Sequence, residues 1–172
     1  MDKHNYNEIQ SQLALPYLSS HEGVLEGIFN ILESKFSMKK KSNQSFIDLG
    51  SGNGNVVIYS GINYSIKSIG IEINENLIKE AKDLIKSLNW RQRRYIRIMR
   101  GDLFQYNLEK YDFIYIFSLP SMQKFLDHVF RTAKKGAVVI SYKYSLSNMD
   151  KLLKLAHESK IENVEVYFYI KS

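Results

Sequence analysis

The sequence has no cysteine, two prolines and no apolar run long enough to cross a membrane. Without cysteine, the chain has no disulfides, no thiol nucleophile and no cysteine–zinc site. The four histidines are scattered without metal-ligand spacing, so we predict no metal site. They are His4, His21, His128 and His157. The polar start of the chain, residues 1–8, does not resemble a signal peptide, and we expect a cytoplasmic protein.

The length and composition are typical of one soluble globular domain. With 172 residues, 44% hydrophobic and 13% aromatic, the chain can build a sizeable core. We expect a single monomeric domain over residues 1–172, with residues 1–14 flexible. Lys and Arg total 24 against 18 for Asp and Glu, a net charge of +6. This charge fits either an acidic partner such as nucleic acid or an ordinary lysine-rich surface.

A glycine-rich stretch organises the rest of the chain. Residues 46–55 read F-I-D-L-G-S-G-N-G-N, in which an apolar run ends in three alternating glycines. This pattern predicts a strand, a tight turn and a helix. Glycine allows a ligand to lie against bare backbone, and the first turn of the helix offers unpaired N–H groups to an anion. We therefore predict a cofactor-binding loop.

Two further predicted strands end in acids. The strand over residues 67–72 ends at Glu72, where Rossmann-like proteins place the residue that binds ribose hydroxyls. The strand over residues 95–100 is followed by Gly101 and Asp102. Together with Asp48 in the first strand, these acids point to one crevice outside the carboxyl ends of a parallel sheet.

The remaining pattern alternates strands and helices, which predicts a parallel sheet. The most apolar strand, residues 111–117, is expected at its centre. We expect Gly61 to end the helix after the glycine loop and a single helix over residues 122–134. Residues 151–158 fit a helix or a strand before the clear strand 164–170, and we favour a hairpin. The predicted fold is α/β, Rossmann-like and doubly wound, with a mostly parallel seven-stranded sheet and a C-terminal β-hairpin.

The glycine loop resembles that of the class I S-adenosylmethionine (SAM)-dependent methyltransferases. Their motif acid-x-Gly-x-Gly-x-Gly is matched by Asp48, Gly50, Gly52 and Gly54. The resemblance implies SAM as the cofactor and S-adenosyl-L-homocysteine as its product. It also implies that Glu72 binds the ribose and that the acid after the third strand, Asp102, binds the adenine amino group. The cofactor-binding residues that it implies are Asp48, Gly50, Ser51, Gly52, Gly54, Glu72, Ile73, Gly101, Asp102, Leu103 and Phe117.

A closer resemblance is to the small protein-lysine methyltransferases, a family that includes an archaeal broad-specificity enzyme and the mitochondrial ATP synthase c-subunit enzyme. Their blocks are similar to Asp48–Asn55, to Gly70–Asn74, to Ile116–Pro120 and to Pro16–Ser20. The aromatic final strand corresponds as well. The departures are Asn53, Asn55 and Ser19, where the family has Asp, Arg and Pro. The resemblance implies protein substrates that present lysine.

Methyl transfer to lysine needs an acceptor pocket more than an acid–base triad. An in-line displacement requires positioning, and a dry aromatic pocket lowers the lysine pKa from about 10.4 while holding the cation. We predict Tyr17, Phe117 and Ser118 as catalytic residues. For Tyr142 and Tyr144 the alternatives are a place in this pocket and ordinary strand packing.

Two other functions stay open at this point. The segment from Arg91 to Arg100 mixes arginines with aromatic residues, and this could dock RNA for an RNA methyltransferase or form a solvated turn. No Asn/Asp-Pro-Pro-aromatic motif for base methylation follows the central strand, where Phe117-Ser118-Leu119-Pro120 stands instead. A SAM-binding subunit without activity is the third alternative, and the intact glycines and acids argue against it.

Overall fold

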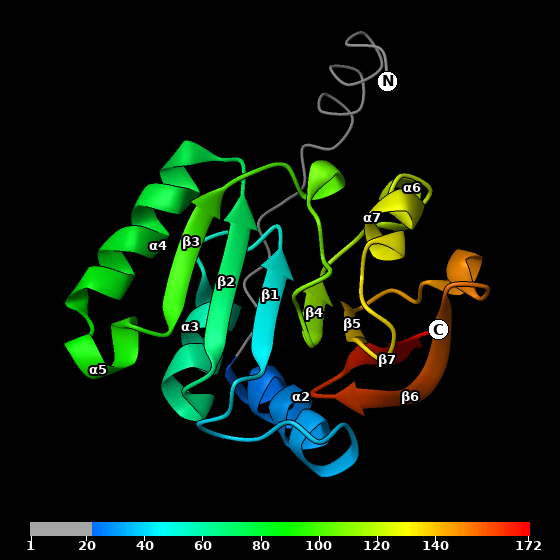
Figure 1. The fold of residues 1–172 in the computed structure, drawn as a ribbon, viewed down its shortest axis with the longest axis horizontal. Helices are drawn as coiled ribbons and strands as arrows, with labels where there is room; N and C mark the ends of the chain where they lie inside the picture. Colours follow the sequence, from blue (N-terminus) through cyan, green and yellow to red (C-terminus); the bar gives the residue numbers. More distant parts are fainter. Residues whose placement is uncertain (1–21) are drawn as a thin grey trace, which may run out of the picture.

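The computed structural model describes residues 22–172 and contains one seven-stranded sheet (Figure 1). The predicted catalytic Tyr17 and the Pro16–Ser20 segment lie outside the described residues. The strand order is β3-β2-β1-β4-β5-β7-β6. The strands are β1 (Ser45–Leu49), β2 (Lys67–Glu72), β3 (Ile96–Arg100), β4 (Phe113–Ile116), β5 (Val138–Tyr142), β6 (Leu153–Ile161) and β7 (Val164–Lys171).

The first five strands are parallel, and the C-terminal pair is antiparallel. Strand β7 lies between β5 and β6, so the hairpin joins the sheet through its second strand. The predicted mostly parallel sheet with a C-terminal hairpin is therefore confirmed, and the ambiguous segment 151–158 is largely strand. Strand β4 is the fourth of seven and fully buried, as its apolar sequence predicts.

Helices cover both faces of the sheet and make a three-layer α/β/α arrangement (Figure 1). One face packs against α2 (Glu22–Lys35), α3 (Asn55–Tyr64) and α4 (Glu75–Ser87). The other packs against α7 (Asp127–Arg131), with Met122 of α6 (Pro120–Gln123) also buried. The short elements are α5 (Trp90–Arg93), η1 (Leu103–Gln105) and η2 (Ser147–Met149). Within residues 22–172, every helix is too short or too polar to span a bilayer.

Gly61 does not end its helix, and that prediction is wrong. Helix α3 continues through Gly61 to Tyr64 and ends at Ser65, which has the left-handed φ of 54° and donates its N–H to the Gly61 carbonyl over 3.2 Å. A Cβ at Gly61 would overlap the side chain of Ile96 in β3. The glycine therefore serves close packing of the helix on the sheet.

The single helix predicted over residues 122–134 is also wrong. The structure has two short helices, α6 and α7, separated by a turn at Lys124–Leu126. The N–H groups of Phe125 and Leu126 donate three residues back, to Met122 and Gln123, over 2.9 and 3.0 Å. This tighter winding places Leu126 in the core with no exposed surface. Core packing overrides the helical propensity of the segment.

Candidate active site

The predicted site residues of the described chain meet at the carboxyl edge of the parallel strands. Asp48 lies in β1, Glu72 is the last residue of β2, and Asp102 follows β3. Phe117 and Ser118 follow β4 directly. This edge is the upper end of the β1–β4 arrows in Figure 1, where ligands bind in open α/β sheets. The topology thus brings together what the sequence predicted separately.

The glycine loop is fastened to the second strand. The N–H groups of Gly50 and Ser51 both donate to the Ile71 carbonyl over 2.9 Å. Gly50 and Gly54 have φ values of 82° and 83°, a conformation in which a side chain would be strained. Gly54 precedes α3 and has no side chain to cap it, while Asn53 Oδ1 accepts the Asn55 N–H over 3.4 Å. The start of a helix favours an anionic group of a ligand through its dipole.

Glu72 holds the loop and the strand end in place. Its Oε2 accepts the Gly52 N–H over 2.8 Å, and its Oε1 accepts the N–H groups of Ile73 and Asn74, each over 2.8 Å. The side chain is buried. A carboxylate has about four acceptor sites, so capacity remains for hydroxyl donors of a ligand. The predicted ribose contact is compatible with this geometry and stays a prediction.

Asp48 is a buried carboxyl beside Glu72. It is 3% exposed, and its register partners are Gly70 of β2 and Tyr115 of β4. Burial, and then the negative charge of Glu72, raise the pKa of Asp48 well above its ordinary value. A cationic ligand at this edge would relieve both effects. SAM carries a sulfonium and an ammonium group, so these residues fit the cofactor that the motif implies.

Asp102 organises the turn after β3. Its Oδ1 accepts the Phe104 N–H over 2.9 Å, and its Oδ2 accepts the Gln105 amide over 3.1 Å. Gly101 donates its N–H to the Glu72 carbonyl over 3.0 Å, which ties this turn to β2. The adenine contact predicted for Asp102 stays a prediction beside this observed capping role.

Two apolar residues from the predicted cofactor set border the same turn. Leu103 lies next to the glycine loop, since its Cδ2 would be 3.4 Å from a Cβ at Gly50. Ile73, directly after Glu72, is 45% exposed. Both offer apolar surface of the kind that a flat base packs against.

An aromatic cluster closes the β4–β5 side of the edge. The ring centroid of Phe117 lies 5.8 Å from that of Tyr142 in an edge-on arrangement and 6.0 Å from that of Tyr144 in a stacked one. Tyr142 is buried and also contacts Tyr115, whereas Tyr144 is half-buried. The packing alternative therefore fits Tyr142, and Tyr144 presents the more accessible ring.

The segment that carries Tyr144 is held in a strained conformation. Lys143 has a φ of 72°, which is costly for a residue with a side chain. Four polar contacts hold residues 141–146, three of them to other segments and one within the segment. They are Lys143 N–H to Glu165 O (2.7 Å), Ser141 Oγ to Tyr144 O (2.6 Å), Gln123 Nε2 to Ser145 O (2.8 Å) and Leu146 N–H to Tyr169 Oη (2.7 Å).

Sequence reasoning missed the residues that support this segment. Gln123 has the pattern of a surface residue of a helix, yet it is 2% exposed and joins α6 to the segment after β5. Ser141 has the pattern of a polar interruption in an apolar strand. The Gln123 contact links segments that only the folded chain brings together, so no local signal could have identified it, whereas the Ser141 hydroxyl bonds to Tyr144 only three residues along the chain.

Two buried hydroxyls have no hydrogen-bond partner among residues 22–172. They belong to Ser51 in the glycine loop and Ser118 after β4. A Cβ at Gly70 would overlap the Ser51 hydroxyl, so this side chain packs against β2. Ser118 has no exposed surface and stands at the edge where the acceptor is predicted. An unpaired buried hydroxyl costs about 1–3 kcal/mol, which a ligand contact would recover.

The arginines at the start of the 91–100 segment lie apart from this site, whereas Arg100 lies beside it. Helix α5, with Arg91 and Arg93, is at the opposite end of the sheet from the glycine loop (Figure 1). Arg100 reaches the carboxyl end of β3 and forms an ion pair of 2.7 Å with Glu75. Among residues 22–172, no group of three or more histidine or acidic side chains could hold a metal ion.

Comparison with known proteins assigns the chain to a family. Residues 48–152, more than half of the chain, match the model of the ANTKMT methyltransferase domain. The ATP synthase c-subunit lysine N-methyltransferase of Caenorhabditis elegans is 25% identical over 158 residues, which cover 91% of this chain and 81% of that protein. The family match spans the glycine loop, Glu72, Asp102 and the aromatic cluster.

Solved structures show the same fold at low sequence identity. An RNA methyltransferase from Salinibacter ruber in complex with S-adenosyl-L-homocysteine superimposes with a TM-score of 0.77 and 21% identity, covering 90% of this chain and 94% of that one. Magnesium protoporphyrin IX methyltransferase from Synechocystis, with bound SAM, gives a TM-score of 0.70 and 13% identity, covering 99% and 92%. Family and fold agree with the geometry of the carboxyl edge. The chain therefore belongs to the ANTKMT methyltransferase domain family and is a SAM-dependent methyltransferase.

Proposed function

We propose that this methyltransferase modifies lysine side chains of proteins. The observation that carries the proposal is the aromatic cluster of Phe117, Tyr142 and Tyr144, which borders the edge where SAM fits. Aromatic faces attract an ammonium group, and the Lys143 ammonium already lies 5.5 Å from the Tyr144 ring centroid. The relative from Caenorhabditis elegans, named a lysine methyltransferase, supports the same acceptor.

The cluster suits both stages of lysine binding. The substrate ammonium enters as a cation over the aromatic faces and must then lose a proton, because only the neutral amine is a nucleophile. Transfer from water into an apolar site lowers the lysine pKa. When bound, SAM supplies an electrophilic methyl group, and the residues of this chain have only to align the amine with it. The unpaired Ser118 hydroxyl is our candidate for a hydrogen bond to the amine.

We propose that the cofactor binds at the part of the carboxyl edge formed by β1, β2 and β3, away from the aromatic cluster. We propose Glu72 for the ribose hydroxyls, Asp102 for the adenine amino group and Asp48 for the positive charge of the donor. The glycine loop and the start of α3 then face its carboxylate. We also propose Tyr17 as a catalytic residue on the basis of the sequence, and replacing Tyr17 with Phe and with Ala tests this through turnover.

RNA is the weaker candidate for the acceptor. A structural neighbour is named an RNA methyltransferase, but at 21% identity it shares the fold alone. The arginines that suggested RNA docking, Arg91 and Arg93, lie at the other end of the strands. An RNA held there would have to extend along the whole length of a strand to bring a base to the methyl group.

The direct test is transfer of labelled methyl from SAM into a mixture of cytoplasmic protein and RNA. We expect label that survives nuclease, is lost with protease and is recovered as methyl-lysine. Label lost to nuclease instead would overturn the proposal in favour of RNA. A Tyr144→Ala variant that binds SAM normally but transfers little label would connect the activity to the aromatic cluster.

A further inference from the structure

Within residues 22–172, many of the basic residues lie at the amino edge of the parallel strands, opposite the proposed cofactor site. Exposed lysine or arginine residues lie at or just before the first residue of each of the five parallel strands, β1 to β5. We call this set the basic edge. Its members are Lys39, Lys40, Lys41, Lys67, Arg91, Arg93, Arg94, Lys110, Lys134 and Lys135.

The basic edge accounts for the entire positive charge of the described chain. Of 24 Lys and Arg and 18 Asp and Glu, only Lys3, Asp2 and Glu8 precede residue 22, which leaves 23 basic and 16 acidic residues and a net charge of +7. The ten basic residues of the edge are accompanied in the same segments by two acids, Glu109 and Asp112, for a net +8. The other 13 basic and 14 acidic residues sum to −1. A generally lysine-rich surface would not divide in this way.

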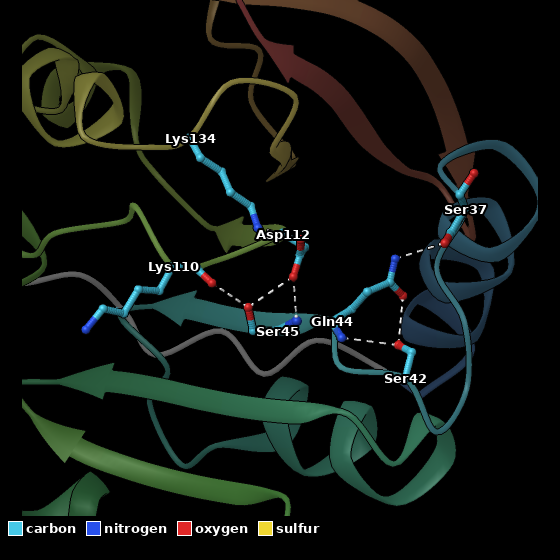
Figure 2. A network of polar contacts seen from close by, with 7 residues as sticks. All are labelled: Ser37, Ser42, Gln44, Ser45, Lys110, Asp112 and Lys134. Atoms are coloured by element: carbon cyan, nitrogen blue, oxygen red, sulfur yellow. Dashed lines mark hydrogen bonds and ion pairs between the residues drawn. The ribbon is translucent and has the colours of Figure 1, made fainter.

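Most of this charge is uncompensated. Among residues 22–172, Lys134 is the only member of the basic edge that forms an ion pair, with Asp112 Oδ1 at 2.6 Å. Asp112 is further occupied by Ser45, whose N–H donates to it over 2.8 Å. Figure 2 shows this network, with the Lys110 side chain extending away from it. One of the two acids is therefore already engaged by the fold.

The basic edge is linear and ends in an exposed aromatic ring. The five parallel strands are neighbours in the order β3-β2-β1-β4-β5. At about 4.8 Å between strands, their starts form a line about 19 Å long. Trp90 in α5 stands at the β3 end, is 61% exposed and has the Arg91 guanidinium 5.5 Å from its ring centroid. The Arg94 guanidinium lies 4.6 Å from the ring centroid of Tyr95, the residue before β3.

We propose that the basic edge binds single-stranded RNA as a docking partner and not as the methyl acceptor. A line of cations that follows a phosphate backbone, with an aromatic ring for base stacking, is the usual construction of such sites. A lipid surface is a poorer match, because Trp90 alone of the six exposed large apolar side chains of the described chain lies in these segments and could insert. A six-residue strand of about 20 Å separates the edge from the donor loop, so bound RNA leaves the acceptor pocket open.

The test is fluorescence anisotropy of a labelled single-stranded RNA of mixed sequence with the full chain. An edge variant replaces Lys39, Lys67, Arg93 and Lys135 with Gln, because these four exposed side chains make no hydrogen bond or ion pair within residues 22–172 that the fold would lose. The matched control replaces Lys79, Lys82, Lys151 and Lys154, which are exposed elsewhere and remove the same charge. We expect RNA affinity to fall at least tenfold in the edge variant and less than about twofold in the control, with a shallower salt dependence in the edge variant only.

Trp90→Ala provides an independent test, with an expected loss of about tenfold from lost stacking. SAM affinity should be unchanged in all variants, which also verifies folding. Equal loss of RNA affinity in the edge and control variants would overturn the proposal, because net charge alone would then explain binding. Edge-dependent binding to anionic phosphatidylserine vesicles without RNA binding would overturn it in favour of a lipid partner.

Discussion

The two ends of the parallel sheet have opposite electrostatic arrangements. At the carboxyl edge, the buried Glu72 carboxylate accepts the backbone N–H groups of Gly52, Ile73 and Asn74. At the amino edge, cations are exposed and most have no acidic partner in the described chain. The first arrangement is fixed and suits one small cationic ligand, whereas the second is open and suits an extended anion. The two edges of one sheet thus keep the site of methyl transfer apart from the proposed RNA-binding surface.

The largest effect on the carboxyl edge is expected from replacement of Glu72. Glu72→Ala leaves the N–H groups of Gly52, Ile73 and Asn74 without their acceptor and removes the proposed ribose contact. We expect SAM affinity to fall by at least a hundredfold, about 3 kcal/mol, as measured by calorimetry. Glu80→Ala, an exposed acid of α4, is the control and should bind SAM normally. Wild-type affinity in Glu72→Ala would refute the ribose assignment.

The next test compares two aromatic rings that each carry a cation, one at each edge. Tyr144→Ala should lower kcat/KM for the protein substrate about tenfold to thirtyfold without changing SAM affinity, because cation–π binding of lysine is lost. Tyr95→Ala, at the amino edge under Arg94, should leave methyl transfer unchanged. Steady-state kinetics on both variants measures the difference. Equal losses would place the effect in stability and not in acceptor binding.

A smaller effect is expected from two buried or half-buried glutamines. Gln123→Met removes the hydrogen bond to the Ser145 carbonyl that supports the Tyr144 segment, and we expect KM for the protein substrate to rise about threefold to tenfold with kcat less affected. Gln44 makes similar contacts at the amino edge, donating to Ser37 O over 3.0 Å (Figure 2). Gln44→Met should lower stability and leave KM alone. A normal KM in Gln123→Met would show that the segment is held by its other contacts.

The two acids Asp48 and Asp112 should respond to pH with opposite sign. Burial and Glu72 raise the pKa of Asp48, so ionisation costs the folded state stability as pH rises above the ordinary carboxyl range. Asp48→Asn should therefore melt a few degrees higher than wild type without SAM, with a gain that grows from about pH 4 upward. The same gain at every pH would exclude titration of Asp48 as its cause.

Asp112 should stabilise the folded state more as pH rises, the reverse of Asp48. Burial raises its pKa, but the bonds from Lys134 and Ser45 outweigh this and hold the pKa below the ordinary value. Its stabilisation is present above the unfolded-state pKa and is lost as pH falls through the lower folded-state value. Asp112→Asn should cost about 1–2 kcal/mol at neutral pH and almost nothing in strong acid, measured by denaturant unfolding. A cost that persists in acid would assign it to packing.

The residues that meet at the carboxyl edge could be predicted from the sequence because their signals are local, while their roles stay predictions. The glycine loop and Glu72 are each recognisable from a few consecutive residues, since a strand end fixes where the next side chain lies. Gly61 was predicted wrongly because a glycine that ends a helix and one that admits Ile96 look alike in sequence. The role of Gln123 could not be predicted, because its partner at Ser145 is distant along the chain.

The basic edge was visible in the sequence only as the arginine run after α4. The lysines before β1, β4 and β5 become its neighbours through the parallel topology, which starts all five parallel strands at the same end. Charge clustering that depends on strand order is therefore a property of the fold and not of any window of residues.

The placement of β7 between β5 and β6 constrains the order in which the sheet can form during synthesis. While the ribosome is producing residues 153–161, β6 has no strand to pair with, because its partner has not been synthesised. Strand β5 meanwhile exposes an unpaired edge that other chains could join. The five parallel strands can assemble early, but the edge of β5 stays open until Val164–Lys171 leaves the ribosome. A nascent chain that stalls before this strand would therefore be prone to aggregation.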